Sequence, residues 1–228
     1  MLCIRRLIQG RGQETPENHS LIVARGFFYR LVSCQGRRMV LSPTAALVII
    51  DVQKAIDHPS WGRRNNPQAE ENIARLLSAW RSTGRPVIHV RHLSREPQST
   101  YHPGQEGCEF KEVVLPQDGE VVITKHTNSA FIGTELAVVL RQERIFTLVI
   151  CGVITNNSVE ATGRMAGNLG YEAFVVSDAT ATFDKVDFAG QLRSAEEVHA
   201  LSLANLQGEY ASVVSTAELL ESIKAKNS

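Results

Sequence analysis

Short apolar runs alternate with longer segments of helical periodicity along most of the chain. Residues 46–50 (ALVII) are apolar without alternation, which is typical of a strand buried on both faces of a parallel sheet. Residues 68–83 instead space their apolar side chains three or four positions apart. That spacing indicates an amphipathic helix, and Gly84 is a suitable residue to end it.

Strand and helix patterns alternate six times, and only residues 96–110 form a long polar loop. This order predicts an α/β fold, with a six-stranded parallel sheet in a three-layer, Rossmann-like arrangement and helices on both faces. The further strands are expected at 86–90, 120–124, 147–151, 172–177 and 211–215, and the further helices at 133–143, 157–169, 194–206 and 217–224.

The first 38 residues differ from the rest, because they hold seven arginines, two acids and no lysine. A basic, acid-poor leader is a feature of transit peptides. The alternative, which we favour, is a basic N-terminal extension over 1–38 ahead of one domain over 39–228.

Composition removes several classes of function. The 24 basic and 24 acidic residues balance, so no overall field attracts nucleic acid or an anionic membrane. No apolar run approaches the roughly 20 residues that span a bilayer, and no Gly-x-Gly-x-x-Gly follows the first strand, which disfavours a dinucleotide site. The cysteines are scattered, which predicts a cytoplasmic protein without a disulfide framework or a zinc site. They are Cys3, Cys34, Cys108 and Cys151. With nucleic acid and membrane disfavoured, the expected partner is a small-molecule substrate.

Three polar residues follow predicted strands at the edge where open parallel sheets bind ligands. Asp51 ends the first strand, Lys125 ends the third, and Ser158 lies at the start of the helix after the fourth. A carboxylate and an ammonium stabilise each other's charged form, and a helix N-terminus offers N–H groups to an oxyanion. Each residue alone is commonly structural, as a cap or a solvated charge. Together they predict an acyl-transfer site.

Three segments carry a family resemblance. Residues 46–53 (ALVIIDVQ) are similar to a strand-Asp-x-Gln opening, and residues 123–131 (ITKHTNSAF) to a lysine segment with a Ser-Ala-Phe turn. Residues 151–162 (CGVITNNSVEAT) are close to the signature Gly-Val-x-Thr-Asn-x-Cys-Val-Glu-x-Thr. Together they resemble the isochorismatase-like (cysteine hydrolase) superfamily over about residues 39–220.

The resemblance implies a mechanism in which a nucleophile, aided by the Asp and the Lys, attacks a small amide, and water then hydrolyses the acyl-enzyme. It implies an oxyanion site at the N–H groups of Ile154 and Ser158, with a cis peptide between Val153 and Ile154. It also implies a homodimer or higher homo-oligomer without a cofactor. The substrate pocket is expected to include Gln53, Phe131, Thr155 and Asn156.

The sequence departs from the family pattern at the nucleophile, where Ser158 replaces the cysteine. A serine hydroxyl is far less acidic than a thiol and needs a base, for which Asp51 is the candidate. Cys151 closes an apolar strand and is expected to be inert, whereas Cys108 lies in the long loop. The histidines that offer an alternative base are His89, His92, His126 and His199.

Three functions therefore stay open. The first is hydrolysis of a carbon–nitrogen bond through Asp51, Lys125 and Ser158. The second is hydrolysis of a vinyl ether such as isochorismate, with Asp51 as general acid and no nucleophile. The third is a catalytically silent binder of small ligands.

Two loops complete the sequence prediction. The loop at 96–110 is interpreted as a lid or a partner contact because of its length. Residues 183–185 loosely resemble a substrate-side loop of the superfamily.

No metal is expected. His58 directly follows Asp57, and no second histidine follows at the spacing of zinc-binding members of the superfamily.

Overall fold

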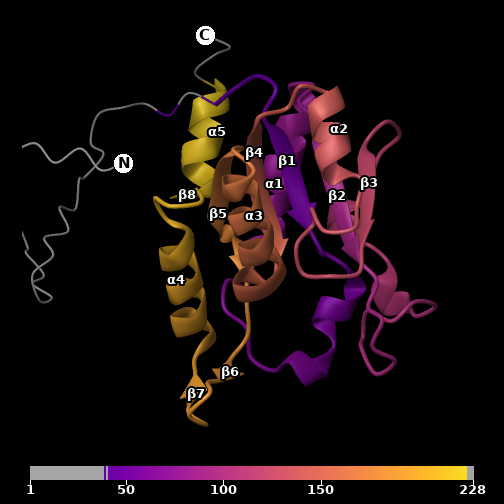
Figure 1. Cartoon of the computed structure of the whole chain (residues 1–228), viewed down its shortest axis with the longest axis vertical. Helices are drawn as coiled ribbons and strands as arrows, with labels where there is room; N and C mark the ends of the chain where they lie inside the picture. Colours follow the sequence, from indigo (N-terminus) through magenta and orange to yellow (C-terminus); the bar gives the residue numbers. More distant parts are fainter. Residues whose placement is uncertain (1–38, 40, 225–228) are drawn as a thin grey trace, which may run out of the picture. The chain divides into compact units, whose positions relative to one another are not determined.

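The computed structural model describes residue 39 and residues 41–224, and the predicted basic extension over 1–38 lies outside the described residues. Six strands form one parallel sheet in the order β3-β2-β1-β4-β5-β8, which confirms the predicted architecture (Figure 1). They are β1 (Ala46–Ile50), β2 (Val87–His92), β3 (Val121–Lys125), β4 (Thr147–Val153), β5 (Glu172–Ala181) and β8 (Ser212–Val214).

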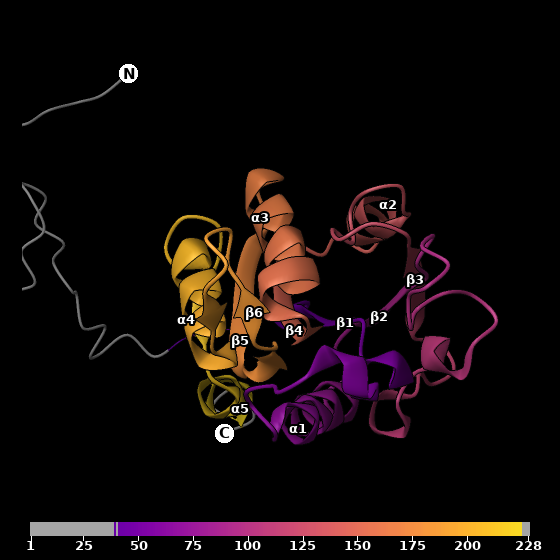
Figure 2. The same cartoon turned by 90° about the horizontal axis from the view of Figure 1, so that it is seen from below.

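Helices cover both faces of the sheet. Helices α1 (Ala69–Ser82) and α5 (Thr216–Lys224) pack on one face. Helices α2 (Leu136–Gln142), α3 (Glu160–Asn168) and α4 (Ala195–Leu206) pack on the other, as the view from below shows (Figure 2). No helix within residues 41–224 combines the length and the apolar character needed to cross a membrane.

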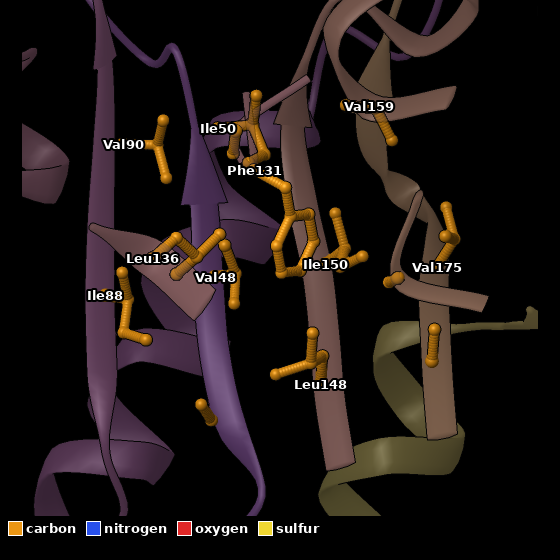
Figure 3. Close-up of a cluster of buried hydrophobic side chains, with 14 of the residues drawn as sticks. Val48, Ile50, Ile88, Val90, Phe131, Leu136, Leu148, Ile150, Val159 and Val175 are labelled. Carbon is orange, nitrogen blue, oxygen red and sulfur yellow. The ribbon is translucent and has the colours of Figure 1, made fainter. Parts of the chain in front are cut away.

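The burial of β1 explains its unbroken apolar sequence. Leu47 and Ile49 pack in the cluster under α1, while Val48 and Ile50 point into the opposite cluster (Figure 3). All five residues of the strand are buried. Burial of one such aliphatic side chain contributes about 1.5–3 kcal/mol, so β1 anchors both layers and fixes the position of the residue that follows it.

Strands β1 and β4 lie too close for a side chain at Gly152, the second-last residue of β4. Gly152 has φ of 118°, and a Cβ atom there would lie 2.1 Å from the carbonyl oxygen of Ile50. Only glycine fits both the backbone conformation and the close approach. The pairing therefore holds Asp51, after β1, beside the end of β4.

The structure differs from the prediction in three segments near this edge. Residues 155–159 form a π-helical turn, so α3 begins at Glu160. Strand β5 continues to Ala181, past an irregularity in its register with β4. A hairpin of β6 (Lys185–Val186) and β7 (Leu192–Arg193) lies beyond the carboxyl ends of the strands (Figure 1). Two-residue strands are too short to leave a periodic pattern.

Candidate active site

The three predicted polar side chains meet at the carboxyl edge of the sheet, although their strands are not all neighbours. Strand β2 separates β3 from β1. Lys125, the last residue of β3, nevertheless reaches Asp51 with its side chain. The sequence predicts that the three strands are neighbours in the sheet. In the structure β2 lies between β3 and β1, and the long side chain of Lys125 extends past the end of β2 to reach Asp51.

Lys125 is the centre of the cluster. Its Nζ donates to Asp51 Oδ2 at 2.6 Å, to Ser158 Oγ at 3.1 Å and to the Thr127 carbonyl oxygen at 3.1 Å. Lys125 is 0% exposed, Asp51 4% and Ser158 7%. All three ammonium protons therefore have acceptors, which is the condition under which a buried charge is tolerated.

The carboxylate of Asp51 keeps one free acceptor atom. Its Oδ1 is buried and has no hydrogen-bond partner within residues 41–224. Burial raises the pKa of Asp51 above its ordinary value, and the opposing effects of Lys125 and Ser158 do not cancel this shift. A carboxylate with a raised pKa and a free oxygen is suited to accept and return a proton.

The turn after β4 presents a backbone donor next to this cluster. The Val153–Ile154 peptide is cis, which is the bond indicated by the family resemblance. The Ile154 carbonyl oxygen accepts from the N–H groups of Asn157 and Val159 at 3.1 and 3.2 Å. The Ile154 N–H itself has no acceptor in the described part of the chain. It is available to a ligand oxygen.

The geometry does not support two of the predicted pocket residues. Gln53 is fully buried, donates to the carbonyl oxygens of His92 and Cys108, and accepts from the His92 N–H. Its amide thus holds the long loop. Phe131 lies in the core cluster together with Leu136 of α2 (Figure 3). Its ring stacks on Tyr171, with the ring centroids 5.6 Å apart. The sequence alone does not show whether a polar or aromatic residue near a motif contacts the ligand or instead stabilises a loop or the core.

The other two predicted pocket residues lie in the π-helical turn. Thr155 is fully buried, with Oγ1 at 3.0 Å from His199 Nδ1. Asn156 lines a cavity, and its Oδ1 accepts from the Thr182 hydroxyl at 2.5 Å. Thr155 therefore connects the turn to His199 of α4, whereas Asn156 lines the cavity.

No candidate histidine bonds to Ser158 within residues 41–224. His89 Nε2 pairs with Glu120 at 2.8 Å, and His126 Nδ1 lies 2.8 Å from the Leu93 carbonyl oxygen. His92 packs against Tyr101, and burial with the charge of Lys125 lowers its pKa to about 4. This geometry leaves Asp51 as the base nearest the serine.

A cavity of about 230 Å³ opens beside the turn. It is bounded by Trp61 and Phe183, whose rings stack with centroids 5.5 Å apart. Trp61 is a residue that sequence reasoning missed, because it lies in a short non-periodic segment after β1. The full lining is Ser60, Trp61, Ile154, Asn156, Asn157, Thr182, Phe183, Asp184 and Lys185.

The long loop packs against the site from the side of β2. Tyr101 is 6% exposed and its hydroxyl donates to the Asp51 carbonyl oxygen at 3.3 Å. The Cys108 thiol in this loop donates to the carbonyl oxygens of Tyr101 and His102.

The other free thiol in the described range, Cys151, is buried, and burial raises its pKa far above the usual range of a cysteine. The described residues hold no group of three or more metal-ligating side chains.

Comparison with known proteins gives matches in family models, in curated proteins and in solved structures. A family model described as "Isochorismatase domain" matches residues 45–218. The chain is 47% identical over 175 residues to the isochorismatase family protein YrdC of Bacillus subtilis, covering 77% of this chain and 94% of the relative. It is 29% identical to Nicotinamidase 3 of Arabidopsis thaliana, covering 80% and 90%. The crystal structure of an isochorismatase-family protein from Chromobacterium violaceum matches with a TM-score of 0.81 and 54% identity, covering 83% of this chain and 98% of that one.

Proposed function

This chain belongs to the isochorismatase family of hydrolases, and on that premise we propose that it cleaves the carbon–nitrogen bond of a small amide at Asp51, Lys125 and Ser158. The observation that carries the proposal is one ammonium bonded to both a buried carboxylate and a hydroxyl, with the second carboxylate oxygen free. The name of the relative Nicotinamidase 3 supports an amide as substrate.

The proposed reaction proceeds through an acyl-serine. Ser158 Oγ attacks the carbonyl carbon while its proton passes to Asp51, and the oxyanion accepts from the N–H groups of Ile154 and Ser158. Collapse of the tetrahedral intermediate breaks the carbon–nitrogen bond, and Asp51 returns the proton to the leaving nitrogen. Water then gives a proton to Asp51, attacks the ester and releases the carboxylic acid with Ser158 restored.

Lys125 has two tasks in this scheme. It offsets the cost of a buried negative charge on Asp51, because the two charges lie in contact in a medium of low dielectric. Its hydrogen bond to Ser158 fixes the position of Oγ. Positioning of this kind lowers the entropic cost of the attack.

A vinyl ether substrate is the second candidate function, and the raised pKa of Asp51 favours it. A carboxyl group that keeps its proton is a better general acid. In that reaction Asp51 protonates the terminal vinyl carbon, and water adds to the oxygen-bearing carbon as it gives a proton back to Asp51. The resulting hemiketal loses the alcohol to leave a ketone, and Ser158 forms no covalent intermediate. Ammonia release from a panel of small amides, with pyruvate-type ketone release from vinyl ethers in parallel, tests one reaction against the other.

The pH dependence of amide turnover is expected to show the state of Asp51. As a base it must be charged, so kcat/KM rises as pH rises through its pKa, which lies above the ordinary 3.8. Lys125→Met removes a group that lowers this pKa, so the acid limb should move to higher pH by about one unit or more. Steady-state rates between about pH 4 and 9 measure the shift. An unmoved limb in a folded variant would contradict the assignment of Asp51 as the base.

We further propose that two copies of the chain associate through the β6–β7 hairpin. Two large apolar side chains are exposed there: Phe188 at the tip of the hairpin is 105% exposed, and Leu201 of α4 is 67% exposed. The neighbouring ion pair of Arg193 with Asp187 supplies a positive and a negative charge, so the same surface on a second copy can pair with it. Phe188→Asp is expected to give monomers in sedimentation velocity. Phe146→Asp, which changes an aromatic side chain 64% exposed before β4, is the matched control. Wild-type monomers would refute the association.

A cytoplasmic location is part of the same proposal. Both cysteines in the described range, Cys108 and Cys151, are free thiols. Free thiols are the common state in a reducing compartment.

A further inference from the structure

The cavity beside the π-helical turn is adjacent to the proposed nucleophile. Ile154, Asn156 and Asn157 line it, and Ser158 is the next residue along the chain. A ligand in this cavity of about 230 Å³ therefore contacts the turn that carries the Ile154 N–H and, at Asn157, the residue before the serine in the chain. The other lining residues set which acyl group fits.

Trp61 and Phe183 form the aromatic part of the cavity lining. Trp61 and Phe183 stack at 5.5 Å with an interplanar angle of 26°. The Trp61 Nε1 donates to the Ala55 carbonyl oxygen at 2.9 Å, which fixes the indole ring. A rigid aromatic surface favours a planar group packed against it.

The charges around the cavity leave one cation without a partner. Asp184 receives two hydrogen bonds from Arg63, at 2.8 and 3.1 Å, and a third from the Ala195 N–H. Asp187, on the same hairpin, is paired with Arg193 at 2.8 Å. Lys185 lines the cavity but forms no ion pair or side-chain hydrogen bond with any residue in the described range.

Asn156 adds a second donor. Its Oδ1 is occupied by the Thr182 hydroxyl, and its Nδ2 protons have no acceptor within residues 41–224. Lys185 and Asn156 therefore offer N–H groups to the cavity and no free acceptor. A carboxylate, which only accepts hydrogen bonds, is the complementary ligand group.

We propose that the preferred substrates are small planar amides that carry a carboxylate, bound by Lys185 and Asn156 while the acyl part packs on Trp61 and Phe183. This inference rests on the proposed amide hydrolysis and names its substrate class. Lys185 is a specificity residue in it and takes no part in the proton transfers at Asp51.

The experiment compares benzamide with 3- and 4-carbamoylbenzoate as substrates of the full chain, with ammonia as the readout. Wild type is expected to prefer the carboxylates in kcat/KM, chiefly through KM. Lys185→Met should reduce that preference about tenfold, the effect of one lost charge-assisted hydrogen bond. Lys185→Arg should keep most of it. Arg141→Met removes a positive charge from α2, away from the cavity lining, and should leave the preference unchanged.

The outcomes separate this inference from the function on which it rests. Turnover of all three amides without a preference, or a preference that survives Lys185→Met, overturns the inference and leaves amide hydrolysis standing. Should no amide turn over, calorimetric titration with 3-carbamoylbenzoate, compared with benzamide, tests the carboxylate site alone. Equal binding to wild type and Lys185→Met then refutes it. A Lys185→Met variant that loses its assembly state would assign the lysine to the subunit contact instead.

Discussion

Asp51→Asn is expected to lower kcat/KM for ammonia release by about 10²–10⁴-fold, the usual contribution of a general acid–base group. The amide side chain is nearly isosteric and still accepts a hydrogen bond from Lys125, but it cannot take the proton of Ser158. Substrate binding should therefore change little, so the loss should fall on kcat. Steady-state and single-turnover rates with the best amide of the panel separate the two parameters.

The controls address folding and charge. Asp118→Asn removes an exposed carboxylate that lines a cavity at the other end of β3, and it should keep full activity. Asp51→Asn leaves Lys125 without its counter-ion, and the loss of one partner of a buried pair costs about 3–5 kcal/mol. A lower melting temperature with a native circular dichroism spectrum is thus expected. Full ammonia release by the folded variant would remove Asp51 from the mechanism and with it the proposed reaction.

Much of the architecture follows from local sequence patterns. Strand β1 is predictable to the residue because all five of its side chains are buried, which forces an unbroken apolar run. Helix α1 begins and ends within one residue of its predicted bounds, since its apolar stripe and Gly84 are both local signals. Where a pattern depends on contacts within one element, the sequence is sufficient.

The site is less predictable because it depends on contacts between distant segments. Asp51, Lys125 and Ser158 are identifiable by motif, yet the sheet order makes the lysine cross β2, which no local pattern indicates. Gln53 and Phe131 belong to the same motifs but support the loop and the core. Trp61 and Phe183 stack on each other in the cavity lining although they are 122 positions apart in the sequence, counted from 61 to 183. Such pairings require the tertiary fold.

Ser158→Ala is expected to reduce amide turnover by at least about 10³-fold, because no other hydroxyl or thiol contacts Lys125 within residues 41–224. The vinyl ether reaction gives the opposite expectation. It needs no nucleophile, so the alanine variant should keep most of its activity while Asp51→Asn does not. Ser222→Ala, at a buried serine of α5 on the opposite face of the sheet, controls for the loss of a buried hydroxyl.

Ser158→Cys tests the same step in the opposite direction. A thiol beside the Lys125 ammonium has a lowered pKa and forms thiolate near neutral pH, so this variant should match or exceed the wild-type rate of ammonia release. Iodoacetamide should inactivate the cysteine variant and leave the wild type active, because the wild type uses no thiol in catalysis. Inactivation of the wild type would assign the reaction to one of its own cysteines. If wild type and cysteine variant both fail on amides and vinyl ethers, yet small carboxylic acids raise the melting temperature, the chain is a ligand-binding member of its family.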